Sequence, residues 1–209
     1  MFAEINKDTI FVYLKAFAKA ISKQYRHIDL DFYIVGGASM VLLPNAREST
    51  MDIDILKQRT VDIKDVAVSV GEMYNLPKDW INDDVMYTSS FSSKLCKYVD
   101  FTKTFSNTVH FHFIKDVALC AMKLKAARMG TNDANDIAFL RTRVSDKDVI
   151  ACYKDLYNEE IDLDKFQLNT LSFQQWCALY APPGYVNWSA ENVESLLRPM
   201  YDMYLQENM

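Results

Sequence analysis

Two carboxylates separated by one apolar residue are the feature of this sequence most suited to chemistry. Asp52 and Asp54 lie in the run 51–56, where apolar and acidic residues alternate. This alternation predicts a half-buried strand, and side chains at positions i and i+2 of a strand point to the same face. Two carboxylates on one face repel each other unless a cation lies between them, and their oxygens suit Mg²⁺. The pair therefore predicts a divalent metal site, with Mg²⁺ or Mn²⁺ as the cofactor.

Gly36 and Gly37 precede the acidic pair and follow the apolar run 31–35, which predicts a strand. Glycine lets backbone N–H groups approach a ligand closely, and the helix expected at 38–43 directs the positive end of its dipole to this turn. Ser39 adds a hydroxyl donor. The turn predicts a phosphate-binding site, and together with a metal site it indicates metal-dependent nucleotidyl transfer.

The order of these residues resembles the nucleotidyltransferase superfamily, whose motif is an apolar residue, Gly, Gly or Ser, a spacer, and then Asp-apolar-Asp-apolar. Here the motif is Val35-Gly36-Gly37 and Asp52-Ile53-Asp54-Ile55, with a spacer of 14 residues. The resemblance implies an α+β, polymerase-β-like fold with a small mixed sheet flanked by helices. It implies Mg²⁺ on the two Asp and the triphosphate on the glycine turn. The alternative is a tight strand-to-helix turn followed by a strand with two solvated Asp.

A second block, 122–137, resembles the Lys-Leu-x-Ala…Arg…Asp-x-x-Asp-apolar pattern of AbiEii-type toxin nucleotidyltransferases. The resemblance implies that Lys123 contacts phosphate and that Arg128 is a second cation. It also implies that Asp133 and Asp136, which share a helix face at i and i+3, support the nucleotide site. The alternative is a pair of amphipathic helices with charged outer faces.

Many members of the superfamily carry a third carboxylate, which acts as a general base or as a further metal ligand. His112, in the predicted strand 109–113, is a candidate base because an imidazole titrates near neutrality. Asp100 is the candidate acid, whereas His110 and His112 otherwise form the outer face of an edge strand. If neither candidate serves, the chain is a slow enzyme or an inactive relative that only binds nucleotide. Arg47 either reaches a phosphate or is solvated.

Composition and charge narrow the functional classes. The net charge of −5 argues against a general nucleic-acid binder, although residues 94–147 hold 10 Lys/Arg against 5 Asp/Glu. That segment is either a face for a polyanion such as tRNA or an ordinary mixture of solvated charges. The four Cys and three His lack the spacing of a zinc site. Because the sequence shows neither a signal peptide nor an 18-residue apolar stretch, we expect a cytoplasmic protein with no membrane partner.

We expect a catalytic domain at 1–144, with an N-terminal helix at 7–26, and a helical region at 145–209. Further strands are expected at 97–102 and 109–113, and further helices at 61–74, 115–129, 133–143, 148–157, 166–179 and 190–207. The resemblance implies a nucleoside triphosphate substrate, an acceptor hydroxyl on RNA or protein, and a cognate antitoxin in a bacterial toxin–antitoxin or phage-defence system. A small-molecule acceptor such as an antibiotic is a related option. A catalytically degenerate module that binds nucleotide or protein is the alternative.

Overall fold

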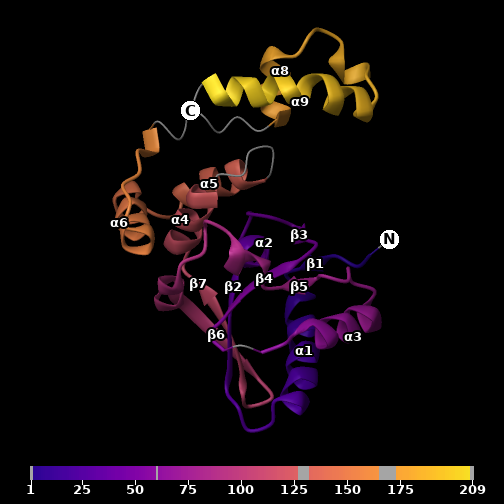
Figure 1. Cartoon of the computed structure of the whole chain (residues 1–209), viewed down its shortest axis with the longest axis vertical. Helices are drawn as coiled ribbons and strands as arrows, with labels where there is room; N and C mark the ends of the chain where they lie inside the picture. Colours follow the sequence, from indigo (N-terminus) through magenta and orange to yellow (C-terminus); the bar gives the residue numbers. More distant parts are fainter. Residues whose placement is uncertain (1, 60, 127–131, 165–172, 208–209) are drawn as a thin grey trace.

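A computed structural model describes residues 2–59, 61–126, 132–164 and 173–207. A five-stranded mixed sheet with the order β5–β4–β2–β7–β6 lies at its centre (Figure 1). β2 runs antiparallel to β4 and parallel to β7, while β6 and β7 form an antiparallel hairpin. The strands are β2 (Leu30–Val35), β4 (Ile53–Lys57), β5 (Ile81–Asn82), β6 (Val99–Phe105) and β7 (Val109–Ile114). The expected fold class, a small mixed sheet flanked by helices, is confirmed.

Helices α1 (Ile10–Gln24) and α3 (Lys64–Tyr74) cover one face of the sheet (Figure 1). Their apolar residues recur at helical spacing and pack on the inward-facing side chains of β2 and β7, as amphipathic helices do. Phe17 of α1 contacts Phe32 and Phe111 at ring-centroid distances of 5.8 and 6.4 Å. The buried indole of Trp80 donates a hydrogen bond to the Ala67 carbonyl, so its polar group is satisfied.

The other face of the sheet is covered over only part of its length. Helices α4 (Asp116–Ala126), α5 (Asp133–Arg141) and α6 (Asp146–Tyr157) form a second core with Tyr33 and Val35 of β2. Leu119 of α4 and Val149 of α6 are both buried in this core. One continuous core therefore crosses the boundary expected at residue 144.

Helix α2 (Gly36–Leu42) starts directly at the end of β2, and the chain then returns through a small second sheet. In that sheet β3 (Ser49–Thr50) pairs antiparallel with β1 (Ile5–Asn6), which fixes the chain just before β4. Two 3₁₀ helices, η1 (Asp84–Tyr87) and η2 (Ser93–Lys97), shape the connection from β5 to β6. Of these two, η1 packs beside β4 and η2 packs beside α6.

The C-terminal helices α8 (Phe173–Tyr180) and α9 (Ala190–Glu207) lie side by side at one end of the molecule, with η3 (Tyr185–Asn187) between them (Figure 1). They share a third apolar cluster that includes Trp176 and Tyr201. The guanidinium carbon of Arg198 lies 3.9 Å from the ring centroid of Phe173, which adds a cation–π contact to this cluster.

Two element boundaries that matter for the site differ from expectation. The strand expected at 51–56 begins at Ile53, so Asp52 precedes it. The helix expected at 38–43 begins at Gly36, so both glycines form its first turn. In the part of the chain that the structure describes, no helix has the length and apolarity needed to span a bilayer.

Candidate active site

The glycine turn and Asp54 are in direct contact. Gly36 has a φ of +65°, a left-handed conformation that glycine adopts without strain. A Cβ at this position would lie 2.4 Å from Oδ2 of Asp54, so only glycine leaves room for the carboxylate. The antiparallel register pairs Val35 with Asp54, which brings the acid beside the end of β2. The pairing of β2 with β4 therefore positions this carboxylate on the turn.

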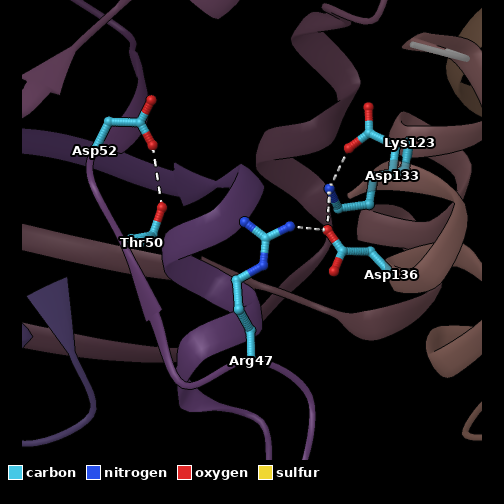
Figure 2. A network of polar contacts seen from close by, with 6 residues as sticks. All are labelled: Arg47, Thr50, Asp52, Lys123, Asp133 and Asp136. Carbon is cyan, nitrogen blue, oxygen red and sulfur yellow. Dashed lines mark hydrogen bonds and ion pairs between the residues drawn. The ribbon is translucent and has the colours of Figure 1, made fainter. Parts of the chain in front are cut away.

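Asp52 reaches the same turn through Thr50. The Thr50 hydroxyl donates to Oδ1 of Asp52 over 3.2 Å. A Cβ on Gly37 would lie 2.7 Å from Thr50 Oγ1 and 2.8 Å from Arg47 Nη1. Hydroxyl and guanidinium thus pack where other residues carry a side chain, and Figure 2 shows Asp52 and Thr50 on one side of Arg47. Of the two carboxylates, Asp54 therefore contacts the glycine turn directly, whereas Asp52 is exposed and is linked to the turn only through Thr50.

Ser39 is buried in α2, one turn from the glycines. Its hydroxyl donates a hydrogen bond of 3.0 Å to the Ile34 carbonyl. The hydroxyl that was expected to donate to a phosphate therefore donates within the strand-to-helix turn. This bond ties the start of α2 to β2 and so stabilises the geometry of the turn.

A buried charge cluster lies beyond the turn (Figure 2). Nζ of Lys123 lies 2.7 Å from Asp133 Oδ1 and 2.7 Å from Asp136 Oδ2. Nη2 of Arg47 lies 2.5 Å from that same Asp136 oxygen. The side chains of Lys123, Asp133 and Asp136 are each 5% exposed. Because buried charges require partners, this cluster fixes α4, α5 and the loop before β3 relative to one another.

A cavity of about 200 Å³ connects the turn with the charge cluster. One wall carries Gly36, Asp54 and Lys123. The remaining wall is apolar on the α4 side and rich in hydroxyl groups on the η1 side, and consists of Asp84, Val85, Thr88, Ser89, Ser90, Leu119, Met122 and Ala126. An apolar cavity with a few convergent polar groups is the usual form of a ligand site. The sequence analysis did not single out the segment around η1 as a border of this cavity.

His112 lies on the same face of the sheet, opposite Tyr33 of β2, and its side chain points toward Asp31. Its Nε2 is 2.8 Å from Asp31 Oδ1, and its Nδ1 is 2.8 Å from Thr102 Oγ1. Its ring stacks on Tyr33 at 4.6 Å, and burial raises the pKa of Tyr33 to about 12. Neither His112 nor Asp100 is among the described residues that line the cavity. Arg128 lies outside the described residues.

The described residues fit the expected Mg²⁺ site only in part. Within the described ranges, no group of three or more His, Cys, Asp or Glu side chains is arranged to hold a metal ion. Mg²⁺, however, usually takes only one or two protein carboxylates and completes its shell with waters and substrate phosphates. Asp54 on the turn and Asp52 behind Thr50 are the carboxylates that would hold such an ion.

The comparison with protein families bears on the same residues. A family model described as "Nucleotidyltransferase of unknown function (DUF6036)" matches residues 11–178. The chain belongs to this nucleotidyltransferase family. The match includes the glycine turn, both acids and the charge cluster, and it ends within α8, so α9 lies beyond it. It supports the superfamily without singling out the AbiEii-type toxins. No curated protein and no solved structure matches the chain.

Proposed function

We propose that this DUF6036 family member is a Mg²⁺-dependent enzyme that transfers a nucleoside monophosphate from a nucleoside triphosphate to an acceptor hydroxyl. One observation carries the proposal. The Asp54 carboxylate lies against Gly36 at the start of a helix, so an acid and a phosphate-binding turn meet at one wall of a cavity. If Asp54 only faced solvent from a strand, the neighbouring position would not require a glycine in the left-handed conformation.

The reaction forms a bond between the acceptor oxygen and the α-phosphorus and breaks the bond from that phosphorus to the bridging oxygen. Pyrophosphate leaves with the electron pair, and the acceptor proton passes to a base or to water. Backbone N–H groups at Gly36 and Gly37 would bind phosphate oxygens, and Lys123 would face them from the cavity wall. These groups act mainly by positioning and by charge neutralisation.

Asp52 and Asp54 are the residues that would hold Mg²⁺, which when bound would offset the charge that develops on the transferring phosphate. The two carboxylates contribute by being held in place before the substrate binds. Asp54 is fixed by β4 and Gly36, and Asp52 by its hydrogen bond from Thr50. This arrangement agrees with the usual Mg²⁺ site of one or two carboxylates.

The acceptor is proposed to be a hydroxyl of RNA or protein in the cytoplasm, with a cognate antitoxin as the regulatory partner. The excess of basic residues in segment 94–147 gives only weak support for a tRNA acceptor. Five of its 10 cationic side chains form ion pairs with acids in the described structure: Lys94, Lys123, Lys125, Arg141 and Arg143. This pairing reduces the positive field available to a polyanion.

Label transfer tests the proposal. The chain is incubated with each α-³²P-labelled triphosphate, Mg²⁺, and either total RNA or total protein, and labelled products are separated on gels. Transfer that requires Mg²⁺ and disappears in Asp54→Asn is expected. Equal labelling by wild type and by a folded Asp54→Asn variant would refute the proposed site.

A nucleotide-binding module without transferase activity is the second candidate. It is favoured by the finding that no third metal-capable side chain joins Asp52 and Asp54 among the described residues. Mg²⁺-dependent triphosphate binding without label transfer to any acceptor fraction is the outcome that would support it.

A further inference from the structure

Helix α1 carries a row of cations on its outer face. Its buried side chains pack into the core beneath the sheet, and the opposite face holds three exposed lysines, Lys15, Lys19 and Lys23. Residues at i and i+4 share one face of a helix, so the three ammonium groups form a line about 12 Å long. Two further exposed cations, Lys7 and Arg26, flank the helix.

This part of the chain is basic, although the chain as a whole is acidic. Residues 7–27 hold five of the 23 Lys/Arg and, with Asp8, one of the 28 Asp/Glu. Their net charge is therefore +4, and that of the remaining residues is −9. An excess of one sign confined to a single helix and its ends is typical of a surface for a polyanion.

The structure separates this surface from the basic segment 94–147. Half of the cations in that segment are paired with acids, whereas none of the five at 7–27 forms an ion pair with an acid of the described residues. This includes the acids of the segments that contact α1 or its ends, which are Glu4, Asp8, Asp62, Asp65, Glu72 and Asp100. A cation that no acid contacts keeps more of its attraction for phosphate.

A further cation joins this surface from the edge of the sheet. Nζ of Lys103, on the edge strand β6, lies 5.6 Å from the ring centroid of Phe11. Phe11 and Lys15 are neighbours at i and i+4 on α1, so Lys103 lies beside the start of the lysine row. Two elements far apart in sequence thus present cations to one surface.

The start of α1 lies at the same end of the molecule as the glycine turn. Lys7 follows Asn6 of β1, which pairs with Ser49 of β3. The next residue of β3 is Thr50, whose Oγ1 would lie 2.7 Å from a Cβ on Gly37. A polyanion bound along α1 therefore extends toward the candidate active site.

We infer that the outer face of α1 binds the phosphate backbone of RNA, which makes RNA rather than protein the acceptor class. This inference rests on the proposed function, because it concerns the acceptor of that reaction. One strand of a duplex carries a phosphate about every 3 Å of its axis, so a row of about 12 Å faces roughly four phosphates. An anionic bilayer fits less well, because the apolar face of α1 is buried in the core and cannot insert.

The test compares RNA binding by the full chain and by a variant with Lys15→Gln, Lys19→Gln and Lys23→Gln. The probe is a fluorescein-labelled RNA duplex of about 20 base pairs with a single-stranded 3′ end, and fluorescence anisotropy is measured over a range of salt without triphosphate. The variant is expected to bind at least about tenfold more weakly and to lower the slope of log K against log salt by about 2–3. An unchanged affinity and slope would overturn the inference.

A matched control removes the same charge from three exposed lysines elsewhere, through Lys78→Gln, Lys97→Gln and Lys147→Gln. It is expected to bind RNA within about threefold of wild type, because the loss lies away from α1. Equal losses in both variants would assign the effect to net charge and would overturn the inference. If the α1 variant fails to fold, as judged by circular dichroism, Lys19→Gln alone is expected to lower the slope by about one.

Competing ligands and label transfer complete the test. Binding to phosphatidylserine vesicles, or to a DNA duplex of the same sequence, without binding to the RNA would overturn the inference. Label transfer to RNA that the α1 variant leaves unchanged would overturn this inference alone. RNA binding that depends on α1, without label transfer to any acceptor, would overturn the proposed function and support the RNA-binding surface.

Discussion

The two ends of one sheet face carry similar residues and differ in what covers them. The turn end consists of Gly36, Asp54 and Lys123, and the open end consists of Asp31, Thr102 and His112. At the turn end α4 and α5 close over the sheet, and the Lys123 side chain is 5% exposed. At the open end the Asp31 side chain is 32% exposed. The open end satisfies its polar groups within itself, whereas the turn end borders a cavity.

The difference teaches that reactive residue types alone do not make a site. Both ring nitrogens of His112 are already hydrogen-bonded, and the carboxylate that it contacts is partly exposed to solvent. At the turn end, by contrast, Asp54 lies against a left-handed glycine at the start of a helix and borders the same cavity as the buried Lys123. Electrostatic interactions are stronger where water is excluded, so the turn end is the better candidate for chemistry.

The largest effect is expected from Asp54→Asn at the turn end. Losing one of the two carboxylates proposed to hold Mg²⁺ is expected to lower kcat about 10³-fold, because several kcal/mol of charge stabilisation disappear. Label transfer under single-turnover conditions measures this loss, and the thermal unfolding midpoint checks the fold. If this variant keeps activity within about threefold of wild type, the turn end is no more important for activity than the open end.

Gly36→Ala is expected to have the second-largest effect. The added Cβ collides with Oδ2 of Asp54 and displaces it, which is expected to lower activity by about 10²-fold. The left-handed φ is expected to cost about 1–2 kcal/mol of unfolding free energy. Gly184→Ala is the matched control, because Gly184 has a φ of +87° with nothing within 4 Å of its would-be Cβ. If both variants lose activity equally, backbone strain and not the carboxylate contact is responsible.

The helices that cover the turn end give the protein a stability limit at alkaline pH. Burial raises the pKa of the Cys120 thiol on α4 from 9.0 to about 12. The unfolded state therefore ionises first, so the stabilisation is complete below pH 9 and is lost as pH rises toward 12. By pH 10 this one thiol is expected to cost about 1 kcal/mol of unfolding free energy. Urea titrations between pH 8 and 10 measure it, and Cys120→Ala is expected to reduce the dependence without abolishing it, because burial also raises the pKa of Cys152 to about 11. A flat profile in the wild type would contradict the expectation.

The smallest effect is expected from His112→Gln at the open end. Activity is expected to stay within about twofold of wild type, while the loss of two partly exposed hydrogen bonds lowers the unfolding free energy by about 1 kcal/mol. Single-turnover label transfer and urea unfolding measure the two quantities, with His110→Gln as the control. A loss of more than about tenfold specific to His112→Gln would restore the histidine as a candidate base.

Much of the fold was readable because its signals are local. The alternation at 51–56 and the apolar run at 31–35 predicted two strands, and both form, with Asp52 just outside the second. The pairing of β2 with β4, which the structure revealed, brings the end of one strand to the start of the next and so places the glycine turn against Asp54. The family match at 11–178 supports the superfamily that this motif resembles.

Only the tertiary structure decided which groups meet across the chain. Sequence spacing joined Asp133 and Asp136 to one helix face, but packing alone placed Arg47 on the same carboxylate as Lys123. Likewise, the η1 loop became a cavity wall because β5 pairs with β4 beside the acids. Periodicity records which way a side chain points within its own element. The partner that it finds there depends on how elements far apart in sequence pack, and no local pattern encodes that.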